Sequence, residues 1–205
     1  MEVVHGIDTV PALAHEVLPH NDAAHTLRRA GTLSRHSRRP AKVLRVGHAV
    51  LRSHRARQMV QWYQHTLGLL CSDEVLAPDG SLALSFNRGD RGDEFVDHHV
   101  LLIDVGPKTG LNHVAYELQD FDDLMLGHEH LQAKGYESVW GVGRHVYGGP
   151  LFDYWMDPWD FLYEHWTDTD RVNAQFQGEL NATMESANGP WGPQVPERFV
   201  THANV

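Results

Sequence analysis

Apolar and polar residues alternate in short runs from Val43 onwards, and turn-forming residues separate the runs. The run Val43–Leu51 is typical of a strand, because alternate side chains of a strand lie on the same face. Residues Arg55–Leu67 instead have apolar residues at helical spacing, and Gly68 is a natural helix end. Three further strands are predicted between turn sequences: Leu69–Val75, Leu82–Asn87 and Asp97–Asp104.

The same order of elements then occurs a second time. Leu111–Leu118 is predicted to be a strand, Asp120 is a suitable N-cap, and a helix runs to about Lys134. Short strands follow at Glu137–Trp140, Leu151–Met156 and Phe161–Trp166. Histidines in the two first strands are 65 positions apart, at 48 and 113, and the helix-ending glycines are 67 apart, at 68 and 135. This repeat predicts an α+β fold of two tandem βαβββ modules, residues 43–105 and 110–168.

The two ends of the chain have a different composition from the modules. Residues 1–42 are rich in Arg, Ser and Pro towards their end, and we expect a poorly structured arm or remnant there, with short helices at Val10–Val17 and Asp22–Ala30. Residues 169–205 form a tail rich in Asn, Gly and Pro, and its WGP sequence at 191–193 is expected to pack a loop on the surface.

Charge and cysteine content narrow the classes of partner. The 205 residues include 17 Lys and Arg against 27 Asp and Glu, a net charge of −10, which argues against nucleic acid as a partner. There is no apolar run of membrane length and no signal segment at the start, so we expect no membrane partner. The single cysteine, Cys71, excludes an internal disulfide and suits the cytoplasm.

Glu164 is the first candidate for chemistry. Alternation in its strand places it on one face with Leu162 and Trp166, where a carboxylate is costly unless it is neutralised. No Lys or Arg lies between positions 144 and 171, so the nearby neutralising groups are His145, His165 or a metal ion.

The repeat relates Glu164 to histidines elsewhere. His113 lies near the middle of the first strand of module two, 51 positions before Glu164, and His48 and His98 have similar places in module one, 50 positions apart. If the modules face each other about a pseudo-twofold axis, these four side chains converge on one cavity. Two histidines and one carboxylate with open positions form the facial triad of non-haem Fe(II) oxygenases.

Several motifs resemble one family, the type I extradiol dioxygenases of the vicinal oxygen chelate superfamily. The matching sequences are VGHAVL (46–51), DHHV (97–100), LNHVAYEL (111–118), GRH (143–145), FDYWMDP (152–158) and YEHW (163–166). The resemblance covers about residues 43–168, which would be the catalytic domain, and within the family it is greatest to the trihydroxytoluene oxygenase branch. It implies paired modules that form an incomplete barrel around a metal site.

The resemblance also implies a role for each matched residue. His48, His113 and Glu164 would be the metal ligands, for Fe(II) or, alternatively, Mn(II). His98 would be the catalytic proton-transfer residue, and His145 and Tyr154 would bind and orient the substrate. The substrates would be a catechol-type molecule and O2, in the degradation of aromatic compounds. His99, as the neighbour of His98 in a strand, is expected to point out of the site.

One feature departs from the family. Its members usually carry another duplicated domain before the catalytic one, and only about 42 residues precede it here. Apolar helix residues such as Met59, Trp62 and Tyr63 could therefore lack their usual cover, and we expect a homo-oligomer.

Two other functions stay open for this sequence. One is a glyoxalase-like metal-dependent isomerase or lyase, which usually has Glu or Gln where His98 stands and has no obvious use for residues 98, 145 and 154. The other is a non-catalytic small-molecule binding protein of the same superfamily, which has no need of a metal triad.

Overall fold

The computed structural model describes residues 8, 11, 19–184 and 189–202. The chain divides into two compact units, Met1–Ser37 and Arg38–Val205. The second unit contains both modules and all the helices and strands found in the described part of the chain.

The described residues of the first unit form bends and turns. The helix predicted at Asp22–Ala30 is therefore wrong. The Asp22 carboxylate accepts hydrogen bonds from the backbone N–H groups of Ala24 and His25, at 2.9 and 2.8 Å, and the Asn21 side chain accepts one from Arg29. Such side chain to backbone bonds compete with helix formation. The helix predicted at Val10–Val17 lies outside the described residues, apart from Pro11.

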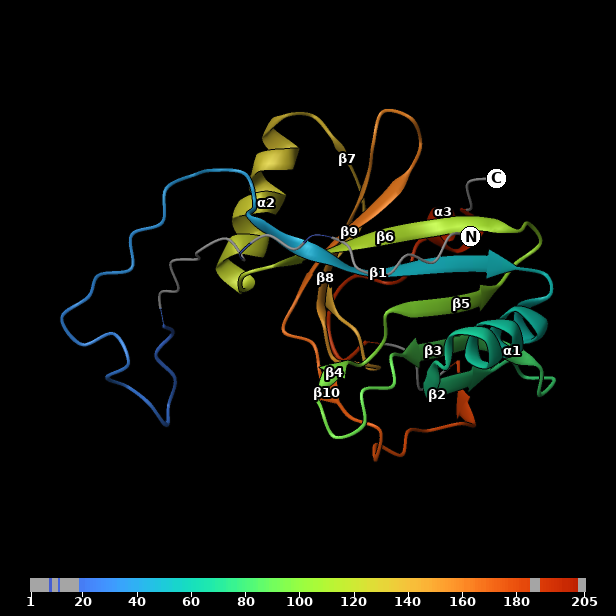
Figure 1. Cartoon of the computed structure of the whole chain (residues 1–205). Helices are drawn as coiled ribbons and strands as arrows, with labels where there is room; N and C mark the ends of the chain where they lie inside the picture. Colours follow the sequence, from blue (N-terminus) through green and yellow to red (C-terminus); the bar gives the residue numbers. More distant parts are fainter. Residues whose placement is uncertain (1–7, 9–10, 12–18, 185–188, 203–205) are drawn as a thin grey trace. The chain divides into compact units, whose positions relative to one another are not determined.

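A nine-stranded sheet forms the body of the second unit (Figure 1). Its strands, in spatial order, are β11 (Ala182–Thr183), β2 (Leu70–Leu76), β3 (Leu82–Arg88), β5 (Leu101–Val105), β1 (Val43–Ser53), β6 (Gly110–Leu118), β9 (Leu162–Thr167), β8 (Leu151–Met156) and β7 (Glu137–Arg144). β1 runs parallel to β5 in module one, as β6 runs parallel to β9 in module two, and the modules join where β1 and β6 pair antiparallel. The predicted fold class of two βαβββ modules is confirmed.

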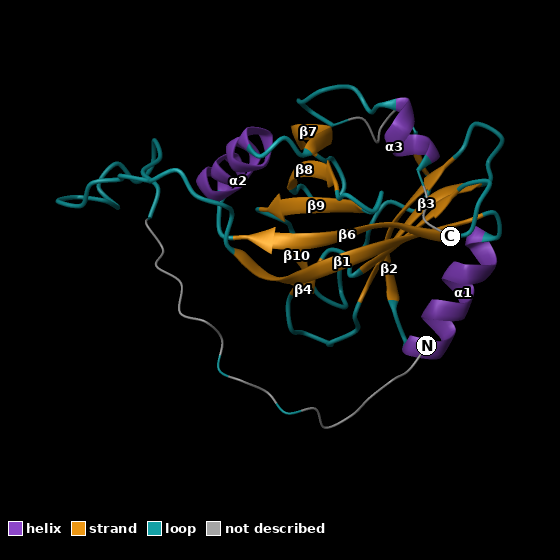
Figure 2. Cartoon of the chain, turned by 90° about the horizontal axis from the view of Figure 1, so that it is seen from above, coloured by secondary structure: helices purple, strands orange, loops and turns teal. Residues whose placement is uncertain are grey.

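One helix covers each module (Figures 1 and 2). Helix α1 (Ala56–Leu67) packs on β3 and β5, and it ends at Gly68, whose φ of 68° is the left-handed conformation that glycine adopts most readily. Helix α2 (Phe121–Ala133) packs on β7, β8 and β9, and the Asp120 side chain caps it by accepting from Asp123 N at 2.8 Å.

The apolar residues of α1 are covered better than the sequence suggests. Met59 and Tyr63 pack against the buried cluster that includes Val60 and Ile103, while Trp62 stays 48% exposed. Of the three residues expected to lack some cover, Met59 and Tyr63 are thus partly buried within the chain, and Trp62 is the one that stays exposed. None of the described helices is long and apolar enough to span a membrane.

The strand predicted at Asp97–Asp104 is interrupted. Val96–Asp97 (β4) pairs with Arg171–Val172 (β10) in a separate two-stranded sheet, and β5 begins only at Leu101. Residues 98–100 between them are not in a strand, because His98 N donates to Asp170 O and Val100 N donates to Asn87 O. The side chains of this connection therefore need not alternate between two faces.

The tail after residue 168 also contributes to the second unit. β10 pairs with β4, β11 pairs with β2, and a short helix α3 (Glu197–Thr201) follows. At the other end, Lys42 N donates to Asp123, and Arg39 forms an ion pair with the same carboxylate. Residues from 38 onwards thus pack with the modules, whereas the sequence places the boundary at 42.

Candidate metal centre

Three neighbouring strands place His48, His113 and Glu164 together. His48 on β1 pairs with Ala115 on β6, and Ala115 pairs in turn with Glu164 on β9. Paired residues lie on the same face of a sheet, and His113 shares that face because it is two positions from Ala115. The three side chains are 5%, 4% and 1% exposed.

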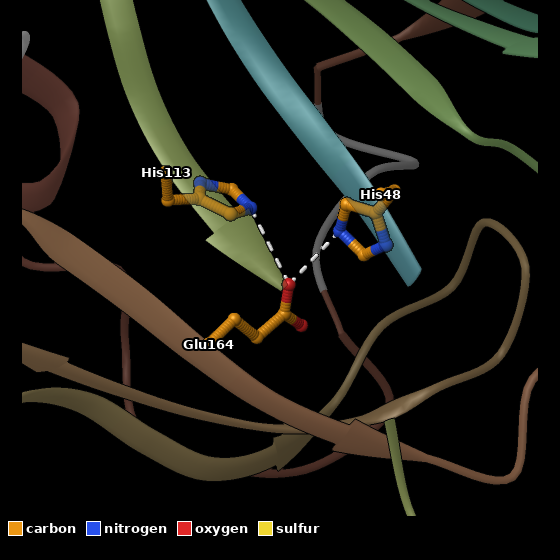
Figure 3. A group of neighbouring side chains, drawn as sticks. All are labelled: His48, His113 and Glu164. Atoms are coloured by element: carbon orange, nitrogen blue, oxygen red, sulfur yellow. Dashed lines mark ion pairs between the residues drawn. The ribbon is translucent and has the colours of Figure 1, made fainter. Parts of the chain in front are cut away.

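The three side chains point at one another (Figure 3). Glu164 Oε2 lies 3.0 Å from His48 Nε2 and 3.3 Å from His113 Nε2. One donor atom from each residue lies within 4.8 Å of the other two, close enough for one metal ion to contact all three. The structure thus brings together the three residues that the sequence singled out as metal ligands.

The space between the three side chains is suited to a cation, both by its unpartnered donor atoms and by the charge of Glu164. His113 Nε2 and both Glu164 carboxylate oxygens are buried without a hydrogen-bond partner. Burial lowers the pKa of His113, which favours its neutral form. Burial alone would raise the pKa of Glu164, but the adjacent imidazoles of His48 and His113 outweigh it and hold that pKa well below its usual value. Neutral imidazole and ionised carboxylate are the forms that bind metals.

The triad lies in the wall of a cavity of about 480 Å³, within the usual size of small-molecule sites. His145 and Tyr154 line the same cavity, and the two side chains meet at 3.0 Å, between His145 Nε2 and Tyr154 Oη. His145 Nε2 also lies 4.0 Å from Glu164 Oε1. Burial lowers the pKa of His145 to about 4 and, together with the charge of Glu164, raises that of Tyr154 well above its usual value. Both side chains are therefore neutral near pH 7.

The sequence predicts that His98 faces the cavity and His99 points away from it, and the structure shows the opposite. His99 lines the cavity, and its ring centroid is 4.4 Å from that of His48. His98 does not line it; instead His98 Nε2 lies 2.6 Å from the buried Asp73 carboxylate. The prediction that His99 points out of the site is wrong, because it assumed a regular strand through residues 98–100.

The rest of the cavity wall is mainly apolar. From module one it receives Val50, Leu82, Leu84, Phe86, Leu102 and Val105, and the tail adds Met184, Trp191, Val195, Phe199 and Val200. Trp191 is 47% exposed, so the WGP sequence does reach the surface, and its residues 191–193 also line the cavity. The wall can therefore accommodate an aromatic ring beside the triad.

Comparison with known proteins identifies the family of the chain. Residues 45–164 match the model of the Glyoxalase/Bleomycin resistance protein/Dioxygenase superfamily. The chain belongs to this superfamily. Its paired modules, few helices and large curled sheet are the vicinal oxygen chelate fold of the superfamily.

One protein of similar sequence and two solved structures of similar fold were compared with the chain. Metapyrocatechase 2 of Cupriavidus necator is 31% identical over 162 residues, which are 78% of this chain and 48% of that protein. The Mn(II)-bound glyoxalase of Novosphingobium aromaticivorans is 29% identical, with a TM-score of 0.67 over 79% of this chain and 51% of that one. Homoprotocatechuate 2,3-dioxygenase of Brevibacterium fuscum, in complex with 3,4-dihydroxyphenylacetate, shares the fold at 17% identity, with a TM-score of 0.67 over 79% of this chain and 50% of that one. The chain thus spans about half the length of these relatives.

Several residues around the triad and its cavity were not predicted from the sequence. Asn112 lies directly before the candidate ligand His113 and is 1% exposed, and Arg52, on the same strand as His48, is 4% exposed and lines the cavity. Alternation in β1 could have indicated Arg52, which is four positions after His48. Asp73 and Phe199 reach the site only through contacts between distant segments, so no local signal indicates them.

Proposed function

We propose that this chain cleaves the aromatic ring of a catechol-type substrate beside its two hydroxyl groups and incorporates both atoms of O2. The observation that carries the proposal is the buried triad His48, His113 and Glu164, with unpartnered donor atoms at the wall of a largely apolar cavity. The similarity to Metapyrocatechase 2 supports it.

The proposed resident metal is Fe(II), with Mn(II) as the alternative. Two histidines and one carboxylate are the ligand set that leaves open positions in non-haem Fe(II) oxygenases. When held by these three residues, the metal would offer open coordination positions and would lower the pKa of a substrate hydroxyl. The protein supplies the neutral imidazoles, the carboxylate and the apolar enclosure.

His99 is the proposed proton-transfer residue, in place of His98. Because the Asp73 carboxylate accepts, His98 Nε2 carries a proton, and His98 Nδ1 can accept from His99 Nδ1 at 3.1 Å. This leaves the lone pair of His99 Nε2 free to take a proton from a substrate hydroxyl and to return it during cleavage. His98 and Asp73 would then hold the His99 ring in position, as the second and third members of a catalytic relay do.

Tyr154 and His145 are the proposed substrate-orienting pair. The Tyr154 hydroxyl stays protonated near neutral pH, so it can donate to an oxygen of the substrate on which charge develops. His145 lies flat against Phe152, with ring centroids 4.0 Å apart and planes 19° apart, which fixes its orientation beside Tyr154.

A single assay tests this function. The apoprotein is loaded with Fe(II) without oxygen and mixed with catechol, air is admitted, and O2 consumption is followed with the appearance of a yellow ring-opened product. We expect one O2 consumed per product formed, and no reaction with the Glu164→Ala variant under the same conditions. Loaded protein that retains iron and catechol but consumes no O2 would contradict the proposal.

A glyoxalase is the second candidate, because the Mn(II)-bound glyoxalase is 29% identical. Its reaction also needs a metal but consumes no O2. Mn(II)-loaded protein that isomerises the hemithioacetal of glutathione and methylglyoxal, and leaves catechol intact, would favour this candidate.

We also propose a homo-oligomer that works in a reducing compartment such as the cytoplasm. Exposed apolar side chains support the first part, among them Val46 at 58% and Trp159 at 77% exposure. The single free Cys71 supports the second, since chains that lack a disulfide framework suit a reducing compartment.

A further inference from the structure

Asn112 joins a metal ligand of the triad to the end of the chain. Its Oδ1 lies 2.6 Å from His113 Nδ1, and its Nδ2 donates to the backbone carbonyl of His202 at 3.1 Å. At 1% exposure, Asn112 is effectively out of reach of solvent. Both ends of one buried amide are thus occupied, one by the metal centre and one by the tail.

This arrangement fixes the protonation of His113. The His202 carbonyl can only accept, so it holds the NH2 group of Asn112 on its own side and keeps the Asn112 oxygen towards His113. That oxygen in turn can only accept, so the proton of the neutral His113 ring is on Nδ1. The unpartnered lone pair of His113 Nε2 then points at Glu164 and the proposed metal position.

The tail segment that supplies the carbonyl is anchored at both ends. We use the name C-terminal strap for residues 189–202. At its end, Arg52 donates to the carbonyls of Val200 and His202, at 2.5 and 2.6 Å, and Asp104 on β5 holds the Arg52 guanidinium from the other side. At its beginning, Trp140 Nε1 donates to Pro193 O at 2.8 Å.

The C-terminal strap also covers the cavity. Phe199 lies between these anchors, with its ring centroid 4.7 Å from Tyr154, 4.8 Å from Trp140 and 6.0 Å from His113. The strap therefore touches the metal centre at two places, through the ring of Phe199 and through the Asn112 amide.

We propose that the C-terminal strap completes the metal centre, with Asn112 as the positioning residue that sets the tautomer and orientation of His113. The inference rests on the metal centre of the proposed function and extends it to a segment outside both modules. Groups that orient a metal-ligating histidine through its second nitrogen typically change metal affinity by about 10–100-fold. By linkage, a metal that binds more tightly when the strap is in place must also stabilise the strap.

Full-length variants test the role of Asn112 without any turnover. Zn2+ binding to the apoprotein is measured by competition with a chelator, so that the readout is a dissociation constant. We expect Asn112→Leu to weaken binding by about 10–100-fold, and Asn112→Asp, which keeps an acceptor for His113 Nδ1, to restore most of the affinity. Asn87→Leu is the matched control, because Asn87 is also a fully buried strand asparagine but bonds to Ser85 and Gln64 and does not line the cavity.

Backbone amide exchange of residues 197–202 tests the reverse direction of the coupling. Zn2+ is expected to slow exchange there in the wild-type protein and to leave it unchanged in folded Asn112→Leu protein. An Asn112→Leu affinity equal to that of the wild type, or a loss that Asn87→Leu shares, would overturn the inference. A wild-type protein that binds no Zn2+, Mn(II) or Fe(II) would instead overturn the metal centre itself, so the two failures are distinguishable.

Discussion

At the scale of residues, His98 and His99 are adjacent in sequence but have different surroundings. His99 faces the cavity beside His48, whereas His98 lies behind it against Asp73. His99→Gln should therefore keep the bound metal and lower kcat by about 10²–10⁴-fold, the usual contribution of a proton-transfer group. His98→Gln should have a smaller effect, since it removes the support and keeps the reacting group.

Metal content and steady-state kcat of the two purified variants decide between them. Asp73→Asn is the companion of His98→Gln, because it weakens the support of His98 without touching the cavity, and its loss of kcat should likewise be smaller than that of His99→Gln. A larger loss for His98→Gln than for His99→Gln would return the proton-transfer role to His98.

A comparison of the triad with His99 shows what the sequence can predict about the site. His48, His113 and Glu164 lie in strands, so the offset between the modules predicts that they converge, and the resemblance to the family then gives them the role of metal ligands. The same offset also predicts that His98 reaches the cavity, which it does not line. His99 lies in the break between β4 and β5, which depends on hydrogen bonds to Asn87 and Asp170. Those partners are distant in sequence, and no local pattern predicts them.

At the scale of elements, one ion pair fastens helix α2 to the sheet. His128 on α2 lies 3.1 Å from the fully buried Asp153 carboxylate on β8, and the hydrogen bond to Asp153 raises the pKa of His128 above its ordinary value of 6.5. A pKa raised in the folded state contributes stability that is fully present below the unfolded pKa and is lost as pH rises through the folded pKa.

The His128→Gln variant should therefore cost more stability in acid than in base. We expect its free energy of unfolding to fall below that of the wild type by about 1–3 kcal/mol at pH 5.5, the range for hydrogen bonds to charged groups, and by less at pH 9. Urea unfolding at the two pH values measures the difference. A loss that is equal at both pH values, or larger at pH 9, would show that His128 is held by packing and not by its charge.

Helix ends and tail elements differ in how well the sequence predicts them. Gly68 and Asp120 are local signals, and α1 and α2 begin and end within about two residues of the predicted positions. β10, β11 and α3 have no such signals. β10 and β11 form by pairing with β4 and β2 far earlier in the chain, so a sequence read in order shows only a polar tail there.

At the scale of the whole molecule, exposed apolar groups favour self-association. Trp62 on α1 and Trp159 in the turn before β9 remain exposed, while Met59, Val60 and Tyr63 of α1 pack within the chain. Light scattering on a sizing column should therefore give a multiple of the 23.2 kDa chain mass at micromolar concentration. A mass near 23 kDa would show that the protein is a monomer and would contradict the prediction.

Deleting residues 1–37 separates the contribution of the first unit. The deletion ends there because Arg39 and Lys42 contact Asp123 and belong with the modules. An oligomer that persists in the shortened chain locates the interface in the second unit. An oligomer that dissociates after the deletion locates the interface in the first unit.

The central claim, ring cleavage with both oxygen atoms taken from O2, is tested most directly by isotope labelling. Fe(II)-loaded protein is mixed with catechol under 18O2 in ordinary water. The ring-opened product is derivatised immediately, and its mass is measured by mass spectrometry. The account predicts a product with an aldehyde group, from cleavage beside the diol, that carries two 18O atoms. A product with one or no 18O atom, or a quinone from simple oxidation, would contradict it.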